Sequence, residues 1–280
     1  MTILYATDCT KNSVPALQYV QKLSLQLKAD LVILYVYDIP PIAGRTIKTE
    51  DQIQRSLKTE KQEFLIKYCI QNSIPEADSL SLTYKVEYGT SISKTILDHA
   101  NGMDINLLVM GMKDEHTRRG LFSGNIANSL LNKTTCKLLI VPNKISFRPI
   151  KKVLYATDFE EEDIRAIDHI TKLFPKEDMS LKIVHVDTDD DKKGEEQLEW
   201  FKEMLLNKID YGNLSFNIVT SESITLGLRK YMDDENPDIV ALLERDEHNL
   251  FKKLFHKDLV RSMESQINIP LLSINHLSLK

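Results

Sequence analysis

The feature that most constrains the fold of this chain is an internal repeat. The segment Ile3-Leu-Tyr-Ala-Thr-Asp8 returns 150 residues later as Val153-Leu-Tyr-Ala-Thr-Asp158. A second segment, Ile33-Leu-Tyr-Val36, returns at the same spacing as Ile183-Val-His-Val186. Because self-similarity at a fixed spacing indicates a duplicated folding unit, the two halves of the chain are expected to share one fold.

The length of the chain also favours two domains. With 280 residues it exceeds one typical domain and is long enough for two that each bury a core. The polar and basic stretch 143–152 separates the two copies of the repeat. We therefore predict one domain over residues 1–145 and a second over residues 150–280.

Apolar runs alternate with segments of helical periodicity in both copies, which predicts the order β-α-β-α-β-α-β-α-β twice. The predicted strands are Ile3–Ala6, Leu31–Tyr37, Leu82–Tyr88, Ile105–Met110 and Cys136–Val141, then Val153–Thr157, Leu181–Val186, Leu214–Val219, Ile239–Leu243 and Pro270–Ile274. Strands joined by helices pair in parallel through right-handed crossovers. The predicted fold class is therefore α/β, with two tandem doubly wound parallel sheets of Rossmann-like type.

Apolar residues at helical spacing predict the connecting helices. The first begins at Ser13 as N-cap, with Pro15 in its first turn. A long solvated helix is predicted over Lys48–Gln71, with Phe64 among its inward residues. The others are predicted around Ile92–Ala100, after Asn125, and around Asp163–Leu173, Glu195–Lys208, Ile224–Met232 and Leu259–Gln266.

The segment 105–125 is the strongest candidate for a binding loop. It leaves a predicted strand at Gly111, crosses a basic loop and enters a helix at Ser123-Gly124-Asn125. Helix N-termini that follow parallel strands hold phosphate groups, because their first N–H groups lack partners and carry partial positive charge. Gly111 and Gly124 would let a ligand approach the backbone. Ordinary turn chemistry explains two such glycines equally well.

Further candidate residues lie where neighbouring strands end. Asp8 follows the first strand, where its carboxylate would accept hydrogen bonds from adenine or ribose, or else cap the next helix. Val36 suits either the pocket or the core. Together these features predict an adenosine-phosphate pocket at the carboxyl ends of the strands. Its residues are Ala6, Thr7, Asp8, Val36, Tyr37, Met110, Gly111, Lys113, Asp114, Ser123, Gly124 and Asn125.

The sequence resembles the universal stress protein family. The resemblance rests on the Ile/Val-Leu-Tyr-Ala-Thr-Asp opening, the Leu-Tyr-Val second strand, the Val-Met-Gly fourth strand and the Cys-Lys-Leu-Leu-Ile-Val-Pro close. Many ATP-binding members have a loop of Gly, two residues, Gly, nine residues, Gly, then Ser or Thr. Here these positions are Gly111, Asp114, Gly124 and Asn125, so the spacing is kept while two residues differ.

The resemblance implies a regulatory module in stress response that binds ATP or a related adenine nucleotide, with no metal beyond a nucleotide-associated Mg²⁺. Asp114 opposes this, because a carboxylate about 4 Å from a phosphate is repelled by roughly 1 kcal/mol in water. Lys113, Arg118 and Arg119 would offset that charge, or else belong to a solvated loop. Ser123 and Asn125 still supply hydroxyl and amide groups.

The second copy lacks the glycines of this loop. Aligning the two loops puts Leu243 at the position of Gly111, and Lys257 and Asp258 at those of Gly124 and Asn125, although Asp158 persists. The expectation is a binding site in the first domain and a degenerate second domain. Slow ATP hydrolysis and a nucleotide-free interaction scaffold stay open as alternatives, and no catalytic residue is assigned.

Composition limits location and partners. A net charge of -5 argues against nucleic acid and anionic membrane surfaces as partners. Cys9, Cys69 and Cys136 lack metal-type spacing and suit a reducing compartment. Because no signal peptide or membrane-length apolar run is present, we expect a cytoplasmic protein. Similar proteins pair domains through their last strands, which implies an intramolecular pseudo-dimer and leaves a homodimer open; the protein partners are unknown.

Overall fold

The computed structural model consists of two compact units, residues Met1–Phe147 and Arg148–Lys280. The structure describes residues 1–38, 50–112, 124–131, 133–174, 179–188, 194–244 and 269–279. Each unit is described by itself below. The boundary between the units falls within the polar stretch 143–152.

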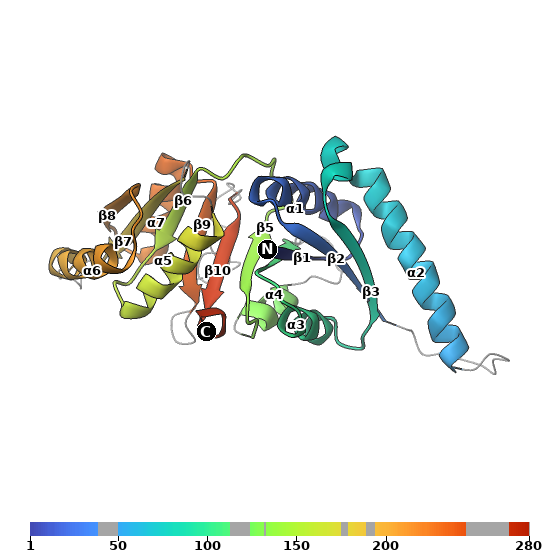
Figure 1. Cartoon of the computed structure of the whole chain (residues 1–280). Helices are drawn as coiled ribbons and strands as arrows, with labels where there is room; N and C mark the ends of the chain where they lie inside the picture. Colours follow the sequence, from blue (N-terminus) through green and yellow to red (C-terminus); the bar gives the residue numbers. More distant parts are fainter. Residues whose placement is uncertain are drawn as a thin grey trace. The chain divides into compact units, whose positions relative to one another are not determined.

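The first unit is a five-stranded parallel sheet with helices on both faces (Figure 1). Its elements are β1 (Thr2–Thr7), α1 (Val14–Leu27), β2 (Asp30–Tyr37), α2 (Glu50–Asn72), β3 (Leu82–Tyr88), α3 (Ile92–Gly102), β4 (Leu107–Gly111), α4 (Gly124–Leu131) and β5 (Lys137–Val141). The strand order is β3-β2-β1-β4-β5. This doubly wound arrangement confirms the fold class predicted from the sequence.

The second unit repeats the plan. Its elements are β6 (Lys152–Ala156), α5 (Glu161–Leu173), β7 (Ser180–Asp187), α6 (Gly194–Lys208), β8 (Leu214–Thr220), α7 (Ile224–Glu235), β9 (Ile239–Glu244) and β10 (Leu271–Asn275). The order β10-β9-β6-β7-β8 matches that of the first unit. The helix predicted around Leu259–Gln266 lies outside the described residues.

A buried tyrosine in the first strand of each unit fixes the turn that follows. The hydroxyl of Tyr5 donates to the carbonyl of Ser13 at 2.9 Å, and the hydroxyl of Tyr155 donates to Asp163 Oδ1 at 2.7 Å. Both tyrosines are fully buried, and a buried hydroxyl without a partner is costly. The two acceptors belong to residues at the same repeat position, Ser13 and Asp163. The first unit uses a backbone carbonyl and the second a side-chain carboxylate.

Two expectations about helices need correction. Ser13 is the N-cap residue of α1 and Pro15 lies in the first turn, but the Ser13 hydroxyl makes no capping bond. It donates instead to the carbonyl of Thr10 at 2.7 Å. Phe64 does not face inward on α2, since 46% of it is exposed and its ring lies 5.8 Å from that of Tyr35. The apolar stripe of α2 therefore meets the core only in part.

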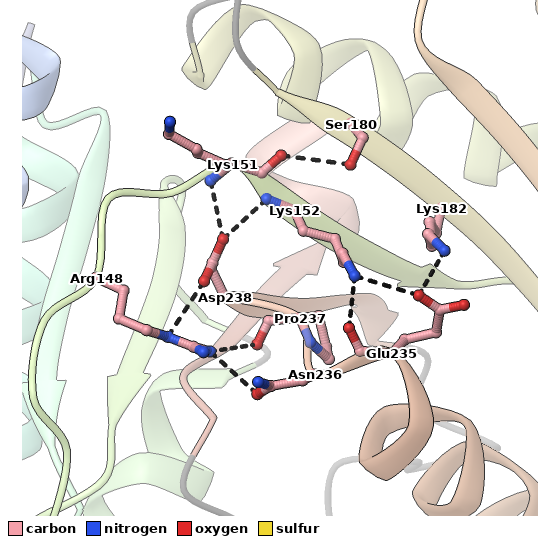
Figure 2. A network of polar contacts seen from close by, with 9 residues as sticks. All are labelled: Arg148, Lys151, Lys152, Ser180, Lys182, Glu235, Asn236, Pro237 and Asp238. Carbon is pink, nitrogen blue, oxygen red and sulfur yellow. Dashed lines mark hydrogen bonds and ion pairs between the residues drawn. The ribbon is translucent and has the colours of Figure 1, made fainter.

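One carboxylate, Asp238, joins the start of β9 to the start of β6 in the second unit (Figure 2). Its Oδ2 accepts hydrogen bonds from the backbone N–H groups of Lys151 and Lys152 at 3.0 and 2.9 Å. Its Oδ1 lies 3.3 Å from Arg148 Nε. Asp238 thus satisfies two backbone donors that the sheet leaves unpaired at its amino end.

Glu235, at the end of α7, forms ion pairs with Lys152 and Lys182 (Figure 2). Lys182 Nζ donates to Glu235 Oε2 at 2.5 Å, and Lys152 Nζ lies 3.3 Å from the same oxygen. Lys152 Nζ also donates to the Glu235 carbonyl at 2.6 Å. The lysines therefore stand where a helix dipole favours positive charge.

The first prediction concerns acid stability. The hydrogen bond from Lys182, more than any other contact, lowers the pKa of Glu235 below its usual value. Because the folded pKa is lower than the unfolded one, this stabilisation is present above about pH 4.3 and is lost as the pH falls through the folded pKa. We expect Glu235→Gln to lower the urea midpoint at pH 7 but to change it little near pH 2, where both states hold the proton.

The control is Glu222→Gln at an exposed carboxylate that forms no ion pair among the described residues. This variant should leave the midpoint unchanged at both pH values. An equal loss in Glu235→Gln at pH 7 and near pH 2 would contradict the assignment, because the deficit would then not depend on the charge.

The second prediction concerns two buried serines at opposite ends of α1, Ser13 at its start and Ser24 in its last turn. Ser24 is fully buried, and its Oγ has no hydrogen-bond partner among the described residues. Removing an unsatisfied buried hydroxyl relieves its desolvation cost, so we expect Ser24→Ala to raise the free energy of unfolding by about 1 kcal/mol. Ser13→Ala removes a satisfied hydroxyl and should lower it by roughly 1–2 kcal/mol. Urea denaturation of both variants measures the contrast, and destabilisation by Ser24→Ala would refute it.

Candidate functional site

The first unit has its topological switch point between β1 and β4. These strands are parallel neighbours, and Ala6 pairs with Met110. Chain connections leave them in opposite directions, toward β2 and toward β5. In open α/β sheets, ligands bind outside the carboxyl ends of the strands at such a point. Asp8 and Gly111 therefore lie at the same edge, as the sequence predicted for neighbouring strand ends.

Asp8 stabilises the turn between β1 and α1 with one of its two oxygens. Asp8 Oδ1 accepts hydrogen bonds from the backbone N–H and the hydroxyl of Thr10, at 3.0 and 2.8 Å. This is an Asx-type turn rather than a cap of α1, whose N-cap is Ser13. Asp8 Oδ2 has no partner among the described residues, so it can accept a hydrogen bond from a ligand.

The turn is unusual at Cys9, whose φ of 54° lies in the left-handed region. Thr7 Oγ1 accepts a hydrogen bond from the backbone N–H of Cys9 at 3.1 Å. Burial raises the pKa of the Cys9 thiol well above its usual value. The thiol is therefore protonated near neutral pH, and Cys9 is a structural residue rather than a nucleophile.

A cluster of buried hydroxyl groups supports this turn from below. Ser13 Oγ lies 2.8 Å from the Tyr68 hydroxyl and 3.3 Å from Thr7 Oγ1. Tyr68 comes from α2, so the cluster connects that helix to the end of β1. Burial raises the pKa of Tyr68, which keeps its hydroxyl protonated and able to donate. Sequence reasoning missed this cluster; its only signal was a polar residue, Ser13 or Asp163, at the same repeat position.

The other predicted strand-end residues do not share one surface. Ala6, Val36 and Met110 lie on one face of the sheet, because successive side chains alternate and their partners are in register. Thr7 and Tyr37 lie on the opposite face. All five side chains are buried, with 4% or less exposed. They form the floor beneath the edge, and only their backbone groups are available to a ligand there.

Gly111 has a packing role as well as a place at this edge. A Cβ atom at this position would lie 3.1 Å from the Cβ of Ala16 on α1. Glycine therefore permits close packing of β4 against α1. Gly124 and Asn125 begin α4, as the sequence predicted. Lys113, Asp114 and Ser123 lie outside the described residues, as do Arg118 and Arg119.

The equivalent edge of the second unit differs in shape and charge. Ala156 pairs with Leu242, as Ala6 pairs with Met110, so Leu243 occupies the position of Gly111. The next residue, Glu244, is a carboxylate with only 2% exposed. This agrees with the loop alignment made from the sequence and places a leucine side chain and a buried carboxyl group where the first unit has Gly111 and Met112.

An aromatic stack fills the space beside β6 in the second unit. Phe159 has a φ of 60°, matching Cys9, and its ring stacks on His185 at 4.5 Å. His185 Nδ1 lies 2.8 Å from the carbonyl of Thr157, and its Nε2 lies 3.2 Å from Asp187 Oδ1. The side chains at this edge therefore bind one another.

The described residues show neither a metal-binding cluster nor a membrane-spanning helix. No group of three or more His, Cys, Asp or Glu side chains there could hold a metal ion. No helix in the same part of the chain is long and apolar enough to cross a membrane.

Comparison with known proteins decides the family. The model of the universal stress protein family matches residues 1–142, which is half of the chain. This chain belongs to that family. Among curated proteins, no sequence matches the chain. The family membership confirms the resemblance that the repeated strand motifs indicated.

Solved universal stress proteins share the fold at low identity. One from Archaeoglobus fulgidus DSM 4304 aligns with a TM-score of 0.65 at 14% identity, covering 98% of this chain and 96% of its own. One assigned to the family from Pseudomonas aeruginosa UCBPP-PA14 aligns with a TM-score of 0.57 at 13% identity, covering 99% and 96%. A universal stress protein in complex with cAMP covers 45% of this chain and 97% of its own, at 12% identity and a TM-score of 0.34. That score is too low to inform the ligand here.

The third prediction tests the packing role of Gly111. Gly111→Leu installs the residue found at the equivalent position of the second unit, and its Cβ meets Ala16. Overpacking of this kind costs roughly 1–3 kcal/mol of unfolding free energy. Gly102→Leu is the matched control, since a Cβ at Gly102 meets no atom within 4 Å. Equal stability of both variants in urea denaturation would show that β4 and α1 do not need the glycine.

Proposed function

We propose that the first unit of this universal stress protein is a regulatory module that binds ATP or a related adenine nucleotide in the cytoplasm. The observation that supports it best is the pairing of β1 with β4, which puts Asp8 and Gly111 at one edge of the sheet. An acceptor oxygen with no partner among the described residues and a bare backbone there are what a nucleoside and its phosphates require.

Each part of this edge has a separate role in the proposal. Asp8 Oδ2 accepts hydrogen bonds from the adenine or the ribose, while Oδ1 stays bound to Thr10. The backbone at Gly111 and the first N–H groups of α4, at Gly124 and Asn125, receive the phosphates. Lys113 and Ser123 of the connecting loop contribute a cation and a hydroxyl, and Mg²⁺ accompanies the nucleotide.

The second unit does not bind nucleotide in this proposal. Leu243 blocks backbone approach, and Glu244 adds a buried carboxyl group that offers phosphate no positive charge. Phe159 and His185 occupy the space beside the first strand. The second unit then supports the first or contacts partners, rather than offering a second site.

The fourth prediction tests the proposal with a matched pair of variants in the full chain. Asp8→Asn keeps an oxygen for Thr10 but removes the charge from the ligand acceptor. Loss of a hydrogen bond to a charged group costs about 1.5–3 kcal/mol, so we expect the ATP Kd to rise about tenfold or more. Asp158→Asn, the equivalent change in the second unit, should leave the Kd unchanged. Isothermal titration with Mg·ATP measures both.

A weaker effect of Asp8→Asn than of Asp158→Asn would overturn the assignment to the first unit. Mass analysis of freshly purified, denatured protein tests for nucleotide already bound, and its absence together with no titration signal would favour a nucleotide-free scaffold. Phosphate release that disappears in Gly124→Arg would identify an ATPase instead of a binding module.

A further inference from the structure

The strands β3 and β8 each end the strand order of their unit and have one unpaired edge. In β8, the carbonyl of Asn213 and the N–H of Ser221 bond to β7. Because backbone groups alternate in direction along a strand, the groups of Leu214, Phe216, Ile218 and Thr220 point away from β7. No hydrogen bond to these outward groups is formed by any described residue.

The composition of β8 is unusual for an exposed edge. Its sequence, Leu-Ser-Phe-Asn-Ile-Val-Thr, contains no charged residue and no proline. Proteins commonly protect exposed edges with lysine, proline or a covering element, because an unprotected edge pairs with other strands. Around β8, the described part of the chain offers none of these protections.

The edge of β3 in the first unit is protected. Its outward groups belong to Leu82, Tyr84, Val86 and Tyr88, by the same alternation. Gln62 Nε2 of α2 donates to the outward carbonyl of Tyr84 at 3.3 Å. The strand also contains Lys85 and Glu87. The outer strand is therefore protected in the first unit and unprotected in the second.

We propose that β8 pairs with β8 of a second copy of this chain, antiparallel and about a twofold axis at Asn217. This register follows from the outward groups, because Phe216 then exchanges both backbone hydrogen bonds with Ile218 of the other copy. Leu214 pairs with Thr220 in the same way. Every outward N–H and C=O group of the strand acquires a partner.

Side chains fit this register. Phe216 opposite Ile218 is an aromatic and β-branched pair, a favourable kind of cross-strand contact. Asn217 faces its own copy across the axis, where two neutral amides meet. The same register on β3 would centre on Lys85 and set two ammonium groups opposite each other, which is destabilising. This contrast explains why the second copy is the occupant of β8 and why β3 does not pair likewise.

The helix beside this edge adds apolar surface. α6 packs against β8, and it exposes 48% of Trp200 and 51% of Leu206. A twofold axis perpendicular to the sheet brings the α6 helices of both copies to the same face of the joined sheets. The interface therefore depends on backbone pairing, with exposed Trp200 and Leu206 on the adjacent helix beside exposed glutamates such as Glu199 and Glu203. It is independent of the proposed nucleotide site in the first unit.

The fifth prediction uses a charge at the twofold axis. Asn217 is exposed, so Asn217→Lys should fold normally and place two ammonium groups opposite each other, as in β3. Two ammonium groups held this close to each other repel, which weakens the pairing. We expect the dimer dissociation constant of the full chain to rise about tenfold or more by sedimentation equilibrium. Lys85→Asn on β3 is the matched control and should leave it unchanged.

A covalent trap tests the register itself. Directly opposite residues in a non-hydrogen-bonded pair have Cα atoms about 4.5 Å apart, within the range that a disulfide spans. In Asn217→Cys, oxidised glutathione should join two copies: two thiols lose two protons and two electrons to form one disulfide, and the glutathione is reduced to two thiols. Lys85→Cys should not cross-link, and the native cysteines are buried.

The outcomes are decisive in both directions. Three results together support the proposal. The wild-type chain forms a dimer, Asn217→Lys weakens that dimer without changing the circular dichroism spectrum, and only Asn217→Cys cross-links. A monomer at concentrations up to about 100 µM, where a micromolar interface is saturated, overturns it. A dimer that Asn217→Lys leaves intact also overturns it, as does a monomer that binds a foreign extended peptide along β8.

Discussion

The pairing of β1 with β4 is the interaction on which the first unit depends. It joins two strands whose connections run to opposite sides, so no crossover covers their carboxyl ends. The close approach of α1 to β4 at Gly111 and the turn held by Asp8 are both consequences of that junction. The features proposed to bind nucleotide thus lie where this fold leaves the strand ends uncovered.

The two units show how a duplicated fold diverges without changing its frame. The buried hydroxyls of Tyr5 and Tyr155 each need a hydrogen-bond acceptor from the following turn. The carbonyl of Ser13 accepts from Tyr5, and the carboxylate of Asp163 accepts from Tyr155. The shared sheet topology depends on buried hydroxyls that have hydrogen-bond partners, whereas residues at the strand ends and outer strands differ between the two units. At its switch point the second unit has Leu243, the stack of Phe159 on His185 and the buried carboxyl group of Glu244. Its β8 also lacks the charged residues found on β3.

Much of the fold could be predicted from the sequence, because parallel strands buried on both faces are continuous apolar runs. Predicted strand bounds came within two residues of those in the structure, and the repeat indicated that both units share one plan. The prediction for Phe64 was wrong because its ring reaches Tyr35 of β2 but no described residue covers its other side, so that 46% of it stays exposed. Contacts such as Ser13 with Tyr68 join distant segments, and no local pattern encodes them. The roles proposed for Lys113, Asp114 and Ser123 remain predictions, because these residues lie outside the described part of the chain.

The single tryptophan of the chain, Trp200, lies on α6 of the second unit. Intrinsic fluorescence at long wavelength therefore reports on one half of the molecule, while far-ultraviolet dichroism averages over both. Denaturation curves recorded by these two signals need not coincide, and any gap between them would measure how far the duplicated halves melt as separate cooperative blocks. Trp200 fluorescence therefore reports on the second unit alone, without any added label.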